Sequence, residues 1–422
     1  GMIDAIVPER DTTIIAVVGD KMRHKPGIAA EIFRALGRQQ INVKAISQGS
    51  SERNISIVIA REDEYAAINV LHRALFPIKE KTVIYLIGTG LVGQEFIKLL
   101  MDGELQLNGV INSRKMLLHS DGVKVNKLVS HLQKKGKKAD ISHFLQMMKV
   151  DPTPRKICVD CTASQDITNC YHDILAMGVS IVTPNKIANT RSMDYYTSLR
   201  EISRKNQVLF KYETTVGAAL PVISTLRTML ETGDRIHRIE AVLSGTLSYI
   251  FNTLSSDISF SNIVKRAVEK GFSEPDPRED LQGIDVARKA LILAREIGYE
   301  LEMPDAVPSS LISDACKMAA SSEEIIALIA ADDAAWRKRI TALQKNGKVL
   351  RYIAEIKEGK ITISVKEIDA NHPFYHLSGP DNIVAIYSDR YPINPLVIKG
   401  AGAGAVVTAG GIMGDVIGIA GT

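Results

Sequence analysis

The chain has few cysteines and a single tryptophan, four and one among 422 residues. So few cysteines exclude a disulfide-rich fold. Cys158 and Cys161 form a C-x-x-C, but no second such pair completes a zinc site. Because they are three positions apart on an expected strand, their sulfurs would face opposite sides of a sheet. We therefore predict packing cysteines in a reducing compartment, and thus a cytoplasmic protein.

Long apolar runs and dense charge clusters are also scarce. The longest weakly polar stretch, Gly402 to Thr422, contains Asp415 and seven glycines, which excludes a membrane span. The N-terminus predicts no signal peptide. The formal net charge is +4, and the one dense basic run, residues 134–138, has no interleaved aromatics. This run is typical of a solvated loop, so we expect neither a membrane nor a nucleic acid as partner.

The composition that remains, 45% hydrophobic and 24% charged, is that of a soluble globular protein long enough for two or three domains. Residues 1–80 predict the order strand, helix, strand, strand, helix, with strands at TTIIAVVGD, INVKAISQGS and RNISIVIA. This order is a ferredoxin-like arrangement, in which helices cover one face of an antiparallel sheet. No closing strand is evident before residue 81, so the unit would depend on another segment for its last strand.

A dinucleotide-binding motif follows in KTVIYLIGTGLVGQEFIKLL. An apolar, β-branched run leads through Gly88, Gly90 and Gly93 into a helix. In this context the first glycine makes a tight turn, the second admits a pyrophosphate, and the third lets helix and strand lie close together. Free N–H groups at the helix start would bind the phosphates. A merely tight strand-to-helix turn is the alternative.

Polar residues follow the next strands, at the edge where doubly wound sheets bind ligands. Arg114 and Lys115 follow the strand LNGVINS, where an NAD-selective enzyme has an acidic residue. Basic groups there favour NADP, and an ordinary surface pair is the alternative. Thr162 and Lys186 follow two further strands, within reach of a nicotinamide or its substrate. A turn threonine and a solvated lysine would occupy the same positions.

From about Pro221 the pattern changes to long helices and then strands at VLRYIAEIK, KITISVKEI and NIVAIYS, spaced as in an antiparallel sheet. The glycine-rich tail is expected to return to the nucleotide domain as a turn and a helix. We therefore predict an α/β protein of three parts. These are a ferredoxin-like domain (1–80), a Rossmann-type doubly wound parallel sheet (81–223, completed by 400–422) and an α+β domain (224–399).

The stretch SEPDPREDLQGIDVARK, residues 273–289, crowds five carboxylates near one lysine. Prolines after Glu274 and Asp276 favour extended backbone at both residues. Asp276 is suited to cap a helix that begins at Pro277, with Glu279 closing a capping box. Capping therefore explains part of this loop without any function.

On the helix after this loop, Asp285 and Lys289 are four residues apart and share one face. A solvated, ion-paired face is one interpretation, since the same stripe carries Arg288, Arg295 and Glu296. The other interpretation follows from the dinucleotide motif, because hydride transfer needs a proton taken from or given to the substrate oxygen. A lysine in a closed cleft, oriented by a carboxylate, can have its pKa lowered enough to exchange that proton. Further carboxylates could hold a substrate ammonium.

These residues resemble the homoserine dehydrogenase family, from about Lys81 to the C-terminus. The most specific likeness is Gly271-Phe-Ser-Glu-Pro-Asp-Pro-Arg followed by Asp285-x-x-x-Lys289. Other matching stretches are Gly88-x-Gly90-Leu91-Val92-Gly93, Asp160-Cys-Thr162, Thr183-Pro-Asn-Lys186, Val216-Gly-Ala-Ala-Leu-Pro221 and Leu243-Ser-Gly-Thr-Leu-Ser-Tyr-Ile250. The resemblance implies reversible NAD(P)-dependent conversion of L-homoserine to L-aspartate 4-semialdehyde.

The family's roles transfer to the matching residues. Lys289 would be the general acid/base with Asp285 as its hydrogen-bonding neighbour, and the substrate would be bound by Glu274, Lys186 and Asp285. The cofactor-binding residues would be Gly88, Gly90, Leu91, Val92, Gly93, Arg114, Thr162, Lys186, Gly271 and Gly402. A monovalent cation, expected to be sodium, would be held largely by main-chain oxygens of Glu213, Val216, Ala218 and Leu220.

The first module resembles an ACT domain, an amino-acid-sensing ferredoxin-like unit. Its place ahead of the dehydrogenase part is that of bifunctional aspartokinase–homoserine dehydrogenase. The resemblance implies the C-terminal part of such an enzyme, cut inside its regulatory region, with Gly1 before Met2 as an expression scar. Threonine would be the effector, near Asn42 and Gln48, for which solvent-facing or strand-capping polar residues are the alternative.

The resemblance also implies that copies of the chain associate. The family is at least dimeric through its second domain, so residues 224–399 would form a catalytic and dimerisation domain of a homodimer or larger homo-oligomer.

One rival function is a sensor fragment that binds nucleotide or amino acid without turnover. Another is a dehydrogenase that acts on a different amino acid or semialdehyde.

Overall fold

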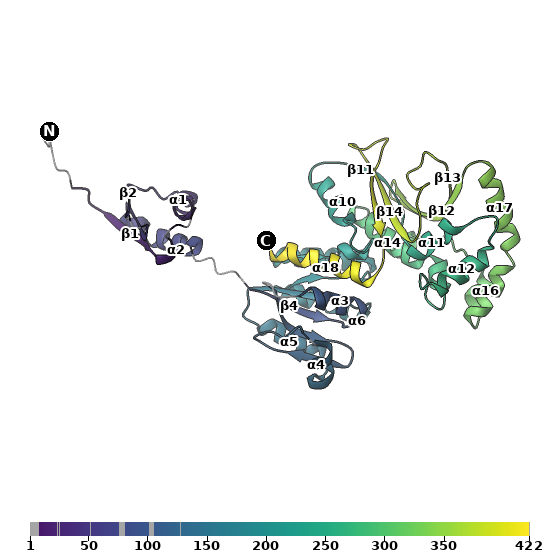
Figure 1. The fold of residues 1–422 in the computed structure, drawn as a ribbon, viewed down its shortest axis with the longest axis horizontal. Helices are drawn as coiled ribbons and strands as arrows, with labels where there is room; N and C mark the ends of the chain where they lie inside the picture. Colours follow the sequence, from purple (N-terminus) through teal and green to yellow (C-terminus); the bar gives the residue numbers. More distant parts are fainter. Residues whose placement is uncertain are drawn as a thin grey trace. The chain divides into compact units, whose positions relative to one another are not determined.

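The computed structural model (Figure 1) describes residues 8–22, 24, 26–50, 52–75, 81–100, 105–126 and 128–421, and the chain divides into two units, 1–80 and 81–422. The first unit has the strands β1 (Thr12–Val18), β2 (Ala45–Gln48) and β3 (Asn54–Ala60), and the helices α1 (Ile28–Arg38) and α2 (Glu64–Leu75). The strands pair antiparallel in the order β1-β3-β2. The predicted ferredoxin-like order is thus confirmed, and residues 8–75 as described include no fourth strand.

Alternation along β3 explains how this small unit folds. Ile55, Ile57 and Ile59 are buried and meet Ile32 and Leu36 of α1, whereas the residues between them face the opposite side of the sheet. One sheet face therefore packs on the helices.

A seven-stranded sheet begins the second unit, in the order β10-β9-β8-β4-β5-β6-β7. Its strands are β4 (Thr82–Ile87), β5 (Leu105–Ile111), β6 (Lys115–Leu118), β7 (Lys137–Lys138), β8 (Arg155–Asp160), β9 (Ser180–Val182) and β10 (Phe210–Lys211). Its helices are α3 (Leu91–Leu99), α4 (Leu128–Lys135), α5 (Ile141–Val150), α6 (Gln165–Asn169), α7 (Tyr171–Ala176), α8 (Ile187–Thr190) and α9 (Met193–Lys205). All of β4 is buried, since helices cover both faces of the sheet.

The predicted parallel sheet holds for five strands and ends in an antiparallel edge. β10, β9, β8, β4 and β5 are parallel, but β6 pairs antiparallel with β5, and β7 pairs antiparallel with β6. The chain reverses after β5 because the side-chain oxygen of Asn112 accepts the backbone N–H groups of Arg114 and Lys115, at 2.9 Å each. Arg114 therefore lies in a hairpin turn.

A five-stranded antiparallel sheet, in the order β13-β12-β11-β14-β15, forms the other half of the second unit. Its strands are β11 (Ile236–Val242), β12 (Val349–Lys357), β13 (Lys360–Ile368), β14 (Asp381–Ser388) and β15 (Leu396–Ala401). Its helices are α10 (Val222–Glu231), α11 (Gly245–Thr253), α12 (Phe260–Glu269), α13 (Arg278–Gln282), α14 (Ile284–Glu296), α15 (Asp314–Met318), α16 (Ser322–Ala330) and α17 (Asp333–Lys345). The predicted antiparallel α+β layer is confirmed.

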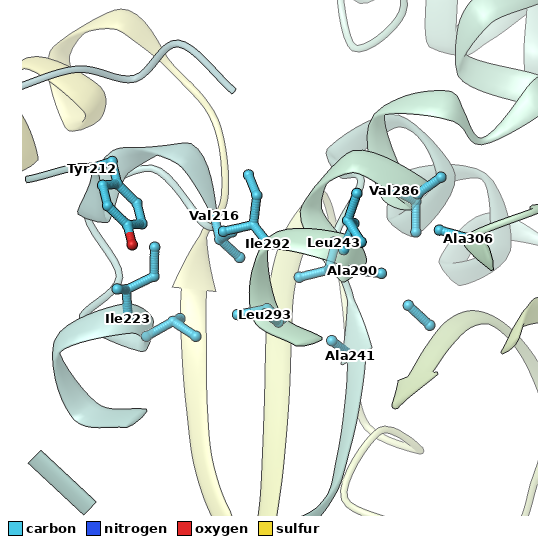
Figure 2. Packing of buried hydrophobic residues seen from close by; sticks show 14 of the residues in the cluster. Tyr212, Val216, Ile223, Ala241, Leu243, Val286, Ala290, Ile292, Leu293 and Ala306 are labelled. Carbon is cyan, nitrogen blue, oxygen red and sulfur yellow. The ribbon is translucent and has the colours of Figure 1, made fainter. Parts of the chain in front are cut away.

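Helix α14 lies at the centre of the core that joins the two sheets. Figure 2 shows Ile292 and Leu293 of α14 between Leu243, which follows β11, and Val216 and Ile223. The same hydrophobic cluster continues into the seven-stranded sheet, so both halves of the second unit share one core. Residues of α14 are therefore held firmly relative to both halves.

The C-terminal helix α18 (Ala405–Ala420) returns to the nucleotide-binding half, as the sequence predicts (Figure 1). It packs against α3, and its Ile412 and Val416 are buried in one cluster with Ile84 and Phe96. No helix in the described ranges is both long and apolar enough to cross a membrane.

Candidate active site

The glycine turn after β4 has the geometry that its motif predicts. Gly88 has a left-handed φ of 95°, and a Cβ there would lie 2.8 Å from the Thr162 methyl carbon. A Cβ at Gly93 would lie 2.1 Å from the Gly88 carbonyl oxygen, whereas a Cβ at Gly90 would meet nothing within 4 Å. The protein itself thus requires the first and third glycines, and the second faces open space.

That open space is a cleft of about 1050 Å³. It brings together Gly88, Gly90, Arg114 and Thr162 from the predicted cofactor set. Helix α3 begins beside it with no side-chain cap, so N–H groups of its first turn lack intrahelical partners and are suited to phosphate. Leu91 in that turn is exposed, and Val92 packs against the core.

Arg114 and Lys115 differ in what holds them. Lys115 donates from Nζ to the Gln133 carbonyl and so ties the hairpin to α4. The Arg114 guanidinium is exposed and has no hydrogen bond or ion pair to any residue that the structure describes. Of the two, Arg114 is the one available to a ligand in the cleft.

The acidic loop and α14 enclose a smaller cavity of about 370 Å³. Lys289 is 8% exposed there, with Nζ 2.7 Å from an Asp285 carboxylate oxygen and donating to the Leu243 carbonyl at 2.7 Å. The solvated-face interpretation is wrong for Lys289, Arg295 and Glu296, whose side chains are buried, whereas Arg288 on the same helix is exposed. The apolar residues beside them on α14 pack against the sheet. The side chains of Arg295 and Glu296 are therefore held inside the protein.

Asp285 lies between two ammonium groups, since its other carboxylate oxygen is 3.3 Å from Lys186 Nζ. Burial alone would raise the pKa of Asp285, but the charges of Lys289 and Lys186 outweigh it and hold that pKa well below its usual range. Burial lowers the pKa of Lys186, and Asp285 only partly opposes this. The carboxylate therefore stays ionised between two amines.

Asp280 is a residue of this cavity that the sequence analysis missed. It lines the cavity and accepts from the Ser273 hydroxyl at 2.7 Å, whereas Glu274 is exposed and does not line it. Burial raises the pKa of Asp280, and the charge of Asp285 adds to this effect. Its place in the same acidic loop was the only signal in the sequence. The role of Glu274 stays a prediction.

The predicted cap in the acidic loop is found in part. Asp276 accepts the Arg278 N–H at 3.0 Å, as a residue that caps a helix from Pro277 would, but no hydrogen bond among the described residues joins the Glu279 side chain to the Asp276 N–H, so the capping box is not closed. The Arg278 guanidinium donates to the carbonyls of Lys317 and Ala319, at 3.0 Å each. The loop is thus anchored on α15 and is also held internally, by the Arg278–Asp276 ion pair at 3.2 Å.

Two further predicted glycines lie at the smaller cavity and not in the larger cleft. Gly271 and Gly402 line it together with Gly404. A Cβ at Gly402 would lie 2.0 Å from the Asn382 amide, so packing alone requires a glycine there. Their predicted contact with the cofactor is therefore expected at the end of the ligand that reaches this cavity.

The segment of the predicted cation ligands, residues 213–220, turns sharply between β10 and α10. Gly217 and Ala218 are consecutive left-handed residues, with φ of 77° and 54°. The Glu213 carboxylate accepts the N–H groups of Ile223 and Ser224, so it caps α10. Among the described residues, no group of three or more His, Cys, Asp or Glu could hold a metal ion. A cation at this segment would therefore depend on main-chain oxygens.

The structure also describes the cysteines and the two predicted effector residues. All four cysteines are free, and Cys158 and Cys161 pack in different hydrophobic clusters, on opposite sides of the seven-stranded sheet. In the first unit Asn42 and Gln48 are both exposed.

Three family profiles match successive parts of the chain. An ACT domain profile matches residues 15–75, the NAD-binding domain of homoserine dehydrogenase matches 88–213, and homoserine dehydrogenase itself matches 221–417. The order agrees with the expected order of domains.

Curated relatives carry the same names. The chain is 41% identical to bifunctional aspartokinase/homoserine dehydrogenase 1, chloroplastic, of Arabidopsis thaliana, over 98% of this chain and 47% of the relative. It is 43% identical to homoserine dehydrogenase of Schizosaccharomyces pombe, over 65% of this chain and 75% of the relative. The chain thus spans about half the length of the bifunctional relative.

A crystal structure of a Candida auris protein of unknown function has the same architecture. It is 34% identical, with a TM-score of 0.76, over 81% of this chain and 98% of that one. The profile match at residues 221–417 includes every residue that lines the smaller cavity. The chain belongs to the homoserine dehydrogenase family and carries an ACT domain ahead of its nucleotide-binding part.

Proposed function

We propose that the chain catalyses the reversible NAD(P)-dependent conversion of L-homoserine to L-aspartate 4-semialdehyde. The observation that carries this proposal is the ion pair between the buried Lys289 and Asp285, which lines a cavity together with the glycine-rich segment leading into α18. We also propose that it is the dehydrogenase part of a bifunctional enzyme with an aspartokinase. The aligned half of the Arabidopsis relative supports that assignment.

Residues in and beside the smaller cavity suit the hydroxyl and ammonium groups of homoserine. Lys289 would exchange a proton with the substrate hydroxyl. Asp285 would orient the ammonium group of Lys289. Because the pKa of Asp285 is lowered, this carboxylate stays ionised while the proton moves. Lys186 would contact substrate and nicotinamide, and Glu274 with Asp280 would hold the substrate ammonium. A nicotinamide cofactor accepts or supplies the hydride when bound.

The larger cleft fits a dinucleotide, since its glycine turn leaves room at Gly90 and the N-terminus of α3 is uncapped. We infer a preference for NADP, because the free guanidinium of Arg114 is suited to a 2′-phosphate. Sodium at the main-chain oxygens of Glu213, Val216, Ala218 and Leu220 is part of the proposal, and the strained φ of Ala218 supports it.

The N-terminal unit would sense threonine near Asn42 and Gln48, and residues 224–399 would join two copies of the chain. The ACT match at residues 15–75 supports the sensing role. Calorimetry with threonine and light scattering of the purified chain test these two statements separately.

The function is tested by incubating the chain with homoserine and NADP in sodium buffer and following the absorbance of the reduced nicotinamide. We expect turnover, and reversal when semialdehyde and NADPH are supplied. Absence of turnover together with threonine binding would favour the sensor interpretation. Turnover of another amino alcohol in preference to homoserine would favour the different dehydrogenase.

The choice of cofactor is tested by Arg114→Gln. Loss of a charged hydrogen-bond donor is expected to raise KM for NADP about 10- to 100-fold and to change KM for NAD less than about 2-fold. Lys115→Gln is the control, since Lys115 holds Gln133 and its loss should affect both cofactors alike. Equal changes for both cofactors in Arg114→Gln would contradict the preference for NADP.

A further inference from the structure

At the far end of α14 from the catalytic pair, Arg295 joins this helix to α8. The residue is 4% exposed, and its guanidinium donates to the carbonyls of Asn189 at 3.0 Å and Arg191 at 2.8 Å. It also donates to the Leu301 carbonyl at 2.9 Å and to Glu302 at 3.0 Å. Carbonyls at a helix end lack intrahelical partners, and the five donors of an arginine suit such a group of acceptors.

The same two helices are joined a second time, at the cavity. Lys186 precedes the first residue of α8 and pairs with Asp285 in the first turn of α14. Asp285 and Arg295 are ten residues apart, or about 15 Å along a helix. Lys289 lies between these two joints. Since α8 follows β9 of the nucleotide-binding sheet and α14 packs on the other sheet, the two joints connect the halves of the second unit across Lys289.

Glu296 strengthens the joint at the far end. Its buried carboxylate is 3.2 Å from Arg200 of α9 and 2.9 Å from Arg227 of α10, and it accepts the Tyr212 hydroxyl. None of these residues lines either cavity described above. The end of α14 is therefore fixed by residues that cannot touch the reacting groups.

We propose that Arg295 is a positioning residue, which fixes α8 against α14 and so holds Lys186 at its working distance from Asp285 and Lys289. The expected effect on turnover depends on the proposed function. A buried ionic group is weak evidence for a role in stability alone, because its desolvation offsets its attraction. A lysine could not replace it, since one ammonium group cannot reach three carbonyls and a carboxylate in a planar fork.

The experiment compares Arg295→Lys with Arg351→Lys. Arg351 is also 4% exposed and also donates to main-chain carbonyls, but all of them belong to the five-stranded half, namely those of Phe251, Leu350, Phe374, Tyr375 and Leu377. Both variants should lower the apparent melting temperature. Only Arg295→Lys should lower kcat, by about 10- to 100-fold, because small misplacements of reacting groups have effects of that size. The Kd for nucleotide should stay within about 2-fold, since the glycine turn is untouched.

Hydrogen exchange of the amides at 186–191 gives a readout that does not depend on activity. It should quicken in Arg295→Lys and not in Arg351→Lys, while exchange in α3 stays unchanged. Unaltered kcat in Arg295→Lys, or an equal loss in both variants, would overturn the proposal. Should Arg295→Lys fail to fold, Glu302→Gln removes the charge that faces Arg295 and keeps an oxygen that can still accept the Met193 N–H, so it should shift kcat and exchange in the same direction.

The two proposals fail in different ways. If the unaltered chain does not oxidise homoserine, the proposed function is wrong, and exchange at 186–191 still decides whether Arg295 holds α8. Unchanged exchange in both Arg295→Lys and Glu302→Gln would overturn the positioning role even where turnover is normal.

Discussion

Replacing Lys289 with alanine is expected to lower kcat about 10³-fold, because a general acid/base contributes rate factors of about 10² to 10⁴. The Nζ of Lys289 is fixed by Asp285 and by the Leu243 carbonyl, and no other residue is held in the same way at this cavity. Lys186 stays paired with Asp285 in the variant, so the carboxylate is not left unpaired. Steady-state kinetics with homoserine and NADP measure the loss.

Nucleotide binding provides the internal control, since Lys289 does not line the larger cleft. Titration of the variant with NADPH by fluorescence should give the Kd of the unaltered chain within about 2-fold. Lys317→Ala is the matched variant, because it removes a lysine side chain that pairs with Asp314 three residues away on α15 and keeps the Lys317 carbonyl that accepts from Arg278. Its kcat should not change. Turnover of Lys289→Ala at the rate of Lys317→Ala would remove Lys289 from the mechanism.

The glycine turn and the Asp285–Lys289 pair could be predicted from sequence because their requirements are local. Positive φ at Gly88 and the close approach at Gly93 each follow from a few residues in a strand–turn–helix context. The Asp285–Lys289 pair follows from helical spacing in the same way. Spacing could not decide whether that face is buried, since burial depends on β11 and the core between the sheets.

Contacts between residues far apart in the sequence were beyond such prediction. Lys186 and Asp285, which form an ion pair, are 99 residues apart in the sequence. Arg295 is 104 and 106 residues away from the two residues whose carbonyls it binds, Arg191 and Asn189. The antiparallel edge of the first sheet was missed because it depends on one side chain, Asn112, that turns the chain back. The layers of sheet and helix could be predicted, since the alternation of apolar and polar residues in strands and the 3.6-residue period in helices are strong signals.

Replacing Gly93 with alanine is expected to destabilise the nucleotide-binding half and to abolish detectable nucleotide binding. Its Cβ would lie 2.1 Å from the Gly88 carbonyl oxygen, and backbone atoms of a tight turn cannot move aside as a flexible side chain can. Overpacking costs about 1 to 3 kcal/mol, and a clash with backbone places this variant at the upper end of that range. We therefore expect the apparent melting temperature to fall by about 5 °C or more, measured by differential scanning fluorimetry.

The variant Gly90→Ala distinguishes an effect on the stability of the turn from an effect on nucleotide binding. No atom lies within 4 Å of a Cβ at this position, and its φ of −71° suits alanine, so the melting temperature should not fall. The added methyl group would point into the space that the pyrophosphate needs, and the Kd for NADPH should rise at least about 10-fold. Tight binding by Gly90→Ala would mean that the phosphates lie elsewhere, whereas a stable Gly93→Ala would mean that helix α3 can move away from the strand without loss.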